Sequence, residues 1–199
     1  MSFTTRGSLD RKGIPAGYRE TLYWRLGEKR WRVITVNLVA LLSLAFWLLL
    51  FRWLGINVGR IPHSAFILPP WVLVLAGILL TLVVHELTHA LAMVAFGAHV
   101  QFGGLLTQGM LYATAPGHAF TRSAFLVIGL APLVGISLLA SIGIILLAGT
   151  PWVNLLALCA AGNVAMASGD LWIVSIVLRY PHSARVIDER DGVRILLPG

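Results

Sequence analysis

The segment His85-Glu86-Leu87-Thr88-His89 places two imidazoles and a carboxylate at a spacing that suits chemistry on a metal ion. Residues four apart lie on the same face of a helix, so the rings of His85 and His89 can point to one position. Zinc accepts such nitrogens in a tetrahedral site, and its catalytic sites keep one position for water. Glu86 is offset from both rings. We therefore expect it to act as a general base on the metal-bound water and not as a ligand.

A catalytic zinc site needs a third protein ligand, and Asp170 is the candidate that the sequence favours. The apolar stretches of the chain contain only four ionisable side chains, namely His85, Glu86, His89 and Asp170. Such groups are costly in a bilayer and persist where they pair or serve a function. Two imidazoles and two carboxylates are a set of metal ligands. The competing ligands are His99 and His118, although a histidine in a glycine-rich loop is more often a surface residue.

Asn163 precedes Asp170 by seven residues, which places it two turns away on nearly the same helix face. Two roles are open for its amide. It could act in catalysis by hydrogen bonding to a substrate carbonyl or to the oxyanion of the tetrahedral intermediate. It could instead form an interhelical hydrogen bond that holds a helix bundle together.

The composition indicates that lipid is the solvent for most of the chain. Hydrophobic residues make up 58% of the 199 residues and charged residues 12%, compared with about 45–50% and about 25% in soluble domains. Eight of the fifteen lysines and arginines lie in the first 32 positions and four follow position 178, so the net charge of +7 flanks the apolar runs. This distribution is typical of cytoplasmic ends facing anionic lipid. It argues against a nucleic-acid partner.

The apolar runs predict an all-α integral membrane fold with four transmembrane helices. A small β-hairpin or re-entrant loop is expected between the second and third helices, because residues 97–122 are rich in glycine and not helical in pattern. Proline and glycine mark the helix starts and breaks. The expected helical runs are Val33–Leu50, a run from near Pro70 to Phe96, and Ser123–Val177, which Gly149-Thr150-Pro151 divides into two.

Three regions follow from this pattern: a basic N-terminal segment at 1–32, a membrane domain at 33–178 and a C-terminal tail at 179–199. The part Tyr18–Trp31 is expected to be an interfacial amphipathic helix or a partly ordered tail. Four spans place both termini on one side. Their basic residues predict a multi-pass protein of the plasma membrane with both termini in the cytoplasm. With a single cysteine, Cys159, no intramolecular disulfide framework is expected. No cleavable signal peptide is expected either.

Helix geometry brings the proposed ligands to a similar depth. A helix that starts near Pro70 carries His85, and one that starts near Pro151 carries Asp170 in the same direction. At about 1.5 Å per residue, His85 lies roughly 22 Å and Asp170 roughly 28 Å along its helix. The difference is about one helical turn.

The intramembrane H-E-L-T-H followed by an Asn and an Asp resembles the site-2 protease class of intramembrane metalloproteases. More closely, the chain resembles a family of short bacterial membrane proteins described as putative zincin peptidases and distantly related to that class. The stretches that carry this resemblance are H-E-L-T-H-A at 85–90, G-M-L-Y-A-T-A-P-G at 109–117, A-P-L at 131–133 and A-S-G-D at 167–170.

The resemblance implies a zinc peptidase in which His85, His89 and Asp170 are the ligands and Glu86 is the catalyst. The chain departs from the site-2 pattern at two points. That pattern has Asn-x-x-Pro before Asp-Gly, whereas the proline is missing after Asn163 and Gly169 precedes Asp170.

The function predicted from the sequence is that of a zinc-dependent intramembrane endopeptidase. Its partners would be the lipid bilayer and a membrane protein or peptide as substrate, with no oligomeric state indicated. Residues 97–117 would hold the substrate in extended form by strand addition. The main alternative is a non-proteolytic membrane protein that binds metal or conducts ions or protons through the same four groups. A structural or pseudoenzyme role is a third alternative.

Overall fold

Four apolar helical spans form most of the molecule. The computed structural model describes residues 13–58, 70–105, 110–190 and 192–199. Within these residues, four helical stretches are long and apolar enough to cross a membrane, as the sequence predicted. The helices are α1 (Arg30–Val58), α2 (Pro70–Ala95), α3 (Arg122–Leu146), α4 (Trp152–Met166) and α5 (Ser168–Val177), and α4 and α5 together make the fourth span.

The outer faces of these helices are apolar. Leu49 on α1 and Leu139 and Leu146 on α3 are each at least 70% exposed. Side chains of this kind would cost free energy in water, whereas lipid accommodates them. The inner faces are lined by small residues, because Ala157, Ala160 and Ala161 of α4 are completely buried and allow the helices to approach closely.

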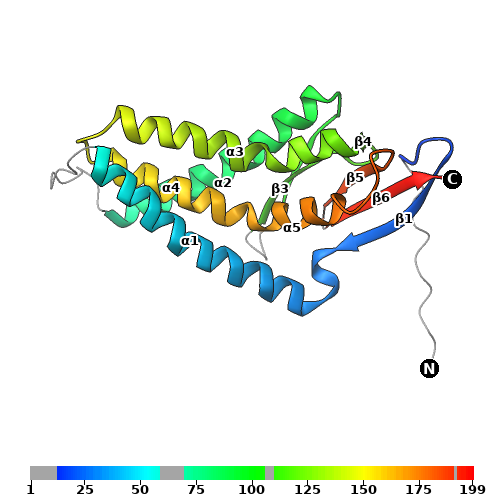
Figure 1. Cartoon of the computed structure of the whole chain (residues 1–199), viewed down its shortest axis with the longest axis horizontal. Coiled ribbons are helices and arrows are strands. Elements are labelled where there is room, and N and C mark those ends of the chain that lie inside the picture. Colours follow the sequence, from blue (N-terminus) through cyan, green and yellow to red (C-terminus); the bar gives the residue numbers. More distant parts are fainter. Residues whose placement is uncertain (1–12, 59–69, 106–109, 191) are drawn as a thin grey trace.

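The helices run alternately away from and toward the end of the molecule that lies on the right in Figure 1. From that end α1 and α3 run outward, and α2 and the α4–α5 pair return to it. The expected parallel direction of the second and fourth spans is therefore present. Both described chain ends lie at this same end of the molecule, as four spans require.

The fourth span is two helices, whereas the sequence predicts one continuous helix from Pro151. Helix α4 ends at Met166 and α5 begins at Ser168, and between them Ala167 has a ψ of −5°. An α-helix has a ψ of about −42°, so the regular helix is interrupted here. The break lies three residues before Asp170, which α5 carries in its first turn.

A β-hairpin joins α2 to α3 in the region where the sequence predicted one. Strand β2 (Gln101–Leu105) pairs antiparallel with β3 (Met110–Thr114), and Phe102 lies opposite Ala113. The residues that join the two strands, 106–109, lie outside the described residues. The hairpin packs against α2, the helix that carries the H-E-L-T-H segment.

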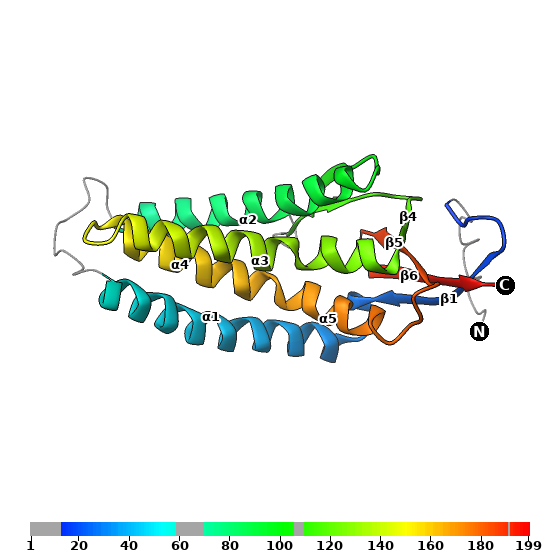
Figure 2. The same cartoon turned by 45° about the horizontal axis from the view of Figure 1, so that its top comes forward.

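A four-stranded antiparallel sheet at the end that carries both termini corrects the all-α prediction. Its order is β1-β6-β5-β4, formed by β1 (Tyr18–Arg25), β6 (Gly192–Pro198), β5 (Arg185–Glu189) and β4 (Ala119–Thr121). The expected amphipathic helix at 18–31 is therefore wrong for its first part, which is a strand beside β6 (Figure 2). The cause is long-range pairing, because Tyr18 lies opposite Pro198.

The sheet is fixed to the helices by a second apolar core. Phe120 of β4, Val186 of β5 and Ile195 of β6 pack with Ile128 of α3 and Val177 of α5, and each is at most 2% exposed. This core joins the sheet to the ends of α3 and α5. It therefore fixes the end of α5, the helix that carries Asp170, to the sheet.

Candidate metal centre

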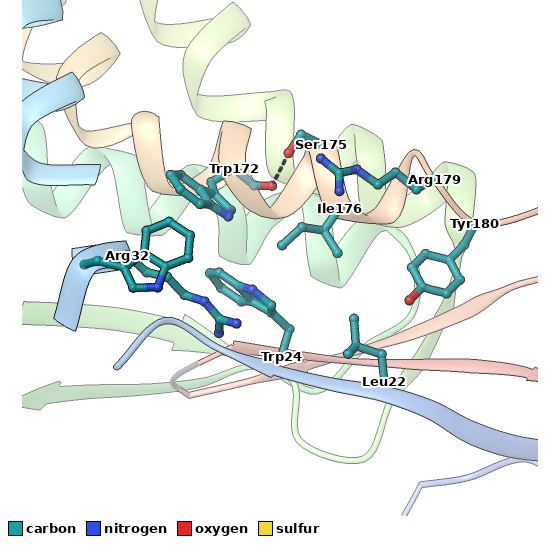
Figure 3. Close-up of a pocket in the computed structure, with 9 residues that line it drawn as sticks. Leu22, Trp24, Arg32, Trp172, Ser175, Ile176, Arg179 and Tyr180 are labelled. Atoms are coloured by element: carbon teal, nitrogen blue, oxygen red, sulfur yellow. Dashed lines mark hydrogen bonds between the residues drawn. The ribbon is translucent and has the colours of Figure 1, made fainter. Parts of the chain in front are cut away.

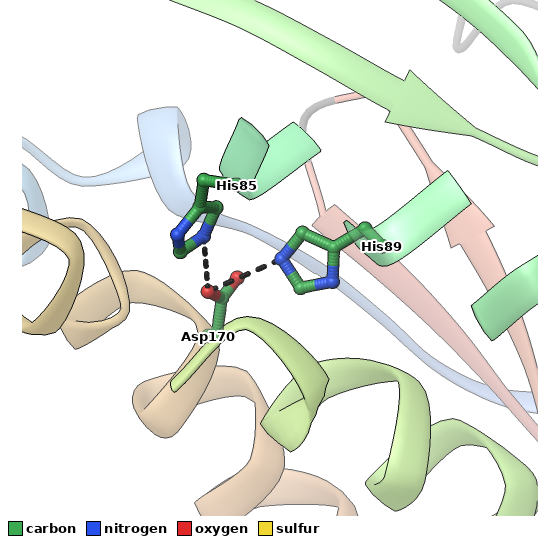
Figure 4. Close-up of side chains that lie close together, drawn as sticks. All are labelled: His85, His89 and Asp170. Carbon is green, nitrogen blue, oxygen red and sulfur yellow. Dashed lines mark hydrogen bonds and ion pairs between the residues drawn. The ribbon is translucent and has the colours of Figure 1, made fainter. Parts of the chain in front are cut away.

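Two histidines of α2 and an aspartate of α5 meet between the helices (Figure 4). The Nε2 atom of His85 lies 3.1 Å from Oδ2 of Asp170, and Nε2 of His89 lies 3.3 Å from the same oxygen. One ligand atom from each residue lies within 4.8 Å of the others. The imidazoles are buried, with 3% of His85 and 9% of His89 exposed.

The far nitrogen of each ring is bonded to an acceptor from another helix. Nδ1 of His85 lies 2.9 Å from Oδ1 of Asn163, and Nδ1 of His89 lies 3.0 Å from the carbonyl oxygen of Ile128. The Asn163 amide cannot be flipped, because its Nδ2 donates to the carbonyl oxygen of Pro132. Both Nδ1 atoms must therefore donate, which leaves each neutral ring with a lone pair on Nε2.

Three hydrogen-bond acceptors consequently point at one another. Two Nε2 lone pairs face a carboxylate oxygen at 3.1 and 3.3 Å. The arrangement is repulsive unless a proton or a cation lies among them. A tetrahedral zinc ion with ligands at about 2.0–2.1 Å separates its ligand atoms by about 3.3 Å. The donor set, its spacing and the bonded Nδ1 atoms fit zinc.

Pro132 makes the acceptor for His89 available. It lies inside α3 and has no backbone N–H, so the carbonyl four residues earlier has no helical partner. That carbonyl belongs to Ile128, which accepts the hydrogen bond from His89. The carbonyl of Pro132 itself accepts from Asn163, which in turn holds His85. One proline therefore organises the hydrogen bonds behind both imidazoles.

Asn163 lies behind the site and has no exposed surface. It bonds to His85 of α2 and to Pro132 of α3, with a further bond of 3.3 Å from its Nδ2 to Oγ of Ser137. These are interhelical hydrogen bonds, the second of the two roles that the sequence left open.

Glu86 lies beside the three potential ligands without belonging to their group. Its Oε2 accepts a hydrogen bond of 2.9 Å from the backbone N–H of Ala113 in β3. The carboxylate therefore lies between the potential metal ligands and the edge of the hairpin. Among the described residues, its second oxygen has no hydrogen-bond partner and could accept a proton.

The two competing histidines lie away from the cluster. His99 is exposed beyond the end of α2, and the ring of His118 stacks against Phe120 with centroids 4.5 Å apart. Neither belongs to the group of potential ligands found within the described part of the chain.

Sequence reasoning missed three groups near the site. The carbonyl of Ile128 and the N–H of Ala113 belong to the backbone and have no side-chain signature, although Pro132 signals a free carbonyl at 128. The third is Asp188 of β5, whose backbone carbonyl accepts from Oγ1 of Thr114. Burial raises the pKa of the Asp188 carboxyl to about 7.

Comparison with family models gives a match over residues 78–185, just over half of the chain, to a family described as putative zincin peptidases. The chain belongs to this family. The zincin-peptidase match contains all three potential ligands together with Glu86 and Asn163. No curated protein and no solved structure gives a significant match.

Proposed function

We propose that the protein is a zinc-dependent endopeptidase that cleaves peptide bonds of membrane-embedded or membrane-adjacent substrates. The observation that carries the proposal is the cluster of His85, His89 and Asp170, in which both imidazoles present acceptor nitrogens to a carboxylate. Membership of the zincin-peptidase family supports the same chemistry.

The roles of the residues follow from their positions. His85, His89 and Asp170 would hold zinc, which when bound supplies an acidified water and polarises the scissile carbonyl. Glu86 would take the proton of the attacking water and return it to the leaving amine. Asn163 would act as a positioning residue, because it fixes the ring of His85 and does not reach the surface.

The free edge of β3 is the proposed binding site for the substrate. The N–H of Ala113 points to Glu86 and not to β2. Alternate residues of an antiparallel pair face the same edge, so the N–H and C=O of Leu111 face it too. A peptide extended along this edge would pass beside Glu86 with its backbone accessible.

The location of the cluster favours a substrate in or at the membrane. His85 and His89 lie in the second span and Asp170 in the fourth. The basic ends of the chain support an orientation in which both termini are cytoplasmic and the cluster lies toward the cytoplasmic side of the bilayer. The resemblance to site-2 proteases agrees with this placement.

The test of the proposal is Glu86→Gln, compared with wild type for zinc content and for cleavage of a model transmembrane peptide in detergent or liposomes. Zinc should remain at about one per chain, and turnover should fall by about 10²–10⁴-fold. Glu28→Gln, a change of the same kind at an exposed residue, should leave both unchanged. Equal cleavage by wild type and Glu86→Gln would refute the mechanism.

Alanine variants test which residues bind the zinc. His89→Ala and Asp170→Ala should each lose most of the zinc, whereas His99→Ala and His118→Ala should keep it. Retention of zinc by Asp170→Ala would remove the third ligand. Ion flux in liposomes that depends on Glu86, without any cleavage, would instead support the non-proteolytic alternative.

A further inference from the structure

A pocket of about 720 Å³ lies between the start of α1, the outer face of α5 and strand β1. Figure 3 shows the indoles of Trp24 and Trp172 on opposite walls, with Arg32 beside them and Tyr180 at the other end. The pocket therefore combines aromatic walls with cationic side chains at the place where the spans meet the sheet.

Arg32 is held in place while part of its guanidinium remains available. The group stacks over the Trp24 ring at 5.3 Å. Its Nη1 donates to the carbonyl of Arg25 at 2.8 Å and to Glu28 at 3.1 Å. Among the described residues, Nε and Nη2 of Arg32 have no hydrogen-bond partner. A planar fork with donors left over is suited to the oxygens of a phosphate.

Arg179 supplies a second cation from the other wall. It is exposed, and its side chain runs back along α5 toward Ser175 (Figure 3). In the part of the chain that the structure describes, its guanidinium forms no ion pair. A ligand in the pocket would therefore meet two arginines on different walls. Among the described residues, the one acidic side chain that pairs with either arginine is Glu28, which pairs with Arg32.

The position of the pocket favours the phosphate of a lipid as the bound anion. It lies at the ends of the first and fourth spans, Arg30–Phe51 and Trp152–Val177. Trp31 and Trp172 stand there with ring centroids 6.0 Å apart, and tryptophans of this kind gather at membrane interfaces. Leu22 and Ile176 add apolar wall for the beginning of an acyl chain.

We propose that this pocket binds the headgroup of an anionic phospholipid from the leaflet on the side of the sheet. Arg32 and Arg179 contact the phosphate, and the indoles pack against the glycerol and upper acyl region. The proposal rests on the membrane placement given above. It is independent of peptidase activity.

The same helix serves the pocket and the metal centre. At about 100° per residue, Trp172, Ser175 and Ile176 lie between about 140° and 240° around α5 from Asp170. The ligand aspartate and the pocket residues thus occupy opposite faces of one ten-residue helix. A bound lipid would pack against the back of the helix that presents Asp170.

The experiment is native mass spectrometry of the full-length protein in detergent, titrated with phosphatidylglycerol or with phosphatidylcholine of the same chain length. Phosphatidylglycerol should bind at least fivefold more tightly, and Arg179→Gln should reduce that affinity about fivefold, as expected for one basic residue. Arg32→Gln should do the same. The matched control is Arg30→Gln, which removes one charge two residues from Arg32 but outside the pocket, and it should change the affinity less than twofold.

Three outcomes would overturn the proposal: equal affinity for the two lipids, equal losses in Arg30→Gln and Arg179→Gln, or displacement of the lipid by millimolar inorganic phosphate. Alkaline carbonate extraction of membranes from cells that express the protein tests the membrane placement separately. Release of the protein into the supernatant would refute that placement whatever the lipid affinity.

Discussion

At the scale of single residues, the site depends on atoms that the metal would not touch. His85 and His89 are each fixed through Nδ1 by an acceptor on a neighbouring helix. Hydrogen bonds of this kind set the tautomer and the direction of a ligand, and their loss typically weakens metal affinity about 10–100-fold. Both of these bonds trace back to Pro132.

Pro132→Ala should weaken zinc binding without weakening the fold. Alanine restores an N–H that competes with His89 for the carbonyl of Ile128, so the zinc dissociation constant should rise about 10–100-fold. Alanine also favours a helix interior by about 3 kcal/mol over proline. The zinc-free protein should therefore melt no lower than wild type.

The measurements for this variant are a zinc titration against a chelator and the visible spectrum of the cobalt-substituted protein, which reports ligand geometry. Pro151→Ala, at the start of α4 and away from the ligands, should change neither. An unchanged dissociation constant in Pro132→Ala would show that the carbonyl of Ile128 does not position His89.

Asp188 should make the stability of the zinc-free protein depend on pH. Burial raises the pKa of its carboxyl to about 7 in the folded state, above the ordinary value of 3.8. The protonated form is thus favoured by folding, and its stabilising effect is complete below about pH 4 and lost as the pH rises through 7. Asp188→Asn should raise the melting temperature at pH 8 and leave it unchanged at pH 4.

The control for this prediction is Glu28→Gln, since Glu28 lies on the surface and pairs only with Arg32 among the described residues. Its melting temperature relative to wild type should not change sign or size between pH 4 and pH 8. A gain in Asp188→Asn that is the same at both pH values would mean that ionisation is not its cause.

At the scale of elements, β3 is the strand of the hairpin that contacts the carboxylate of Glu86. Leu111→Pro would remove the one N–H that faces the free edge there besides that of Ala113, while the bonds to β2 remain possible. Peptidase turnover should fall at least tenfold, with zinc content unchanged. Leu111→Ala, which keeps the N–H, should retain most of the activity. Equal losses in both variants would mean that the side chain, and not the strand edge, is used.

The sequence predicts the elements whose signal is local. Four apolar runs indicate the spans, and glycines between short apolar segments indicate the hairpin. It does not predict β1, because this segment of eight residues forms a strand by pairing with residues 192–198, which are far away in the sequence. Nor does it predict the break at Ala167, which contains neither proline nor glycine.

The same distinction applies to the site. Residue spacing and depth along a helix are properties of the chain, and they suffice to predict that His85, His89 and Asp170 come together. The carbonyl of Ile128 and the N–H of Ala113 are backbone groups, which almost every residue possesses. Which of them faces an imidazole or a carboxylate depends on helix packing, and the sequence alone does not determine it.

At the scale of the whole molecule, tryptophans mark two levels along the bundle. Trp31 is at the start of α1 and Trp172 in α5, at the end that carries the sheet. The exposed side chains of Trp53, Trp71 and Trp152 belong to the last turns of α1 and the starts of α2 and α4, at the other end. Trp31 and Trp53 are 22 residues apart on α1, or about 33 Å. This distance is close to the thickness of about 30 Å of a bilayer core.

Cysteine labelling of intact cells should assign the two levels to the two sides of the membrane. In a Cys159→Ser background, Asn57→Cys at the far end of α1 should react with a membrane-impermeant maleimide. Ser183→Cys, beside the sheet, should react only after the membrane is permeabilised, because we expect the basic termini to lie in the cytoplasm. The reverse pattern would invert the orientation, and reaction of both in intact cells would contradict the four-span arrangement.

The pairing of β1 with β6 has a consequence for the order in which the chain matures. Residues 18–25 are synthesised before the four described spans, yet their partner at 192–198 follows the fourth. In the proposed membrane placement the spans would be inserted one after another, whereas β1 would remain without its partner for about 170 residues of synthesis. Contacts this distant in sequence form late. The wall that β1 contributes beside α5 would therefore form last, after the helices that carry His85, His89 and Asp170 have been synthesised.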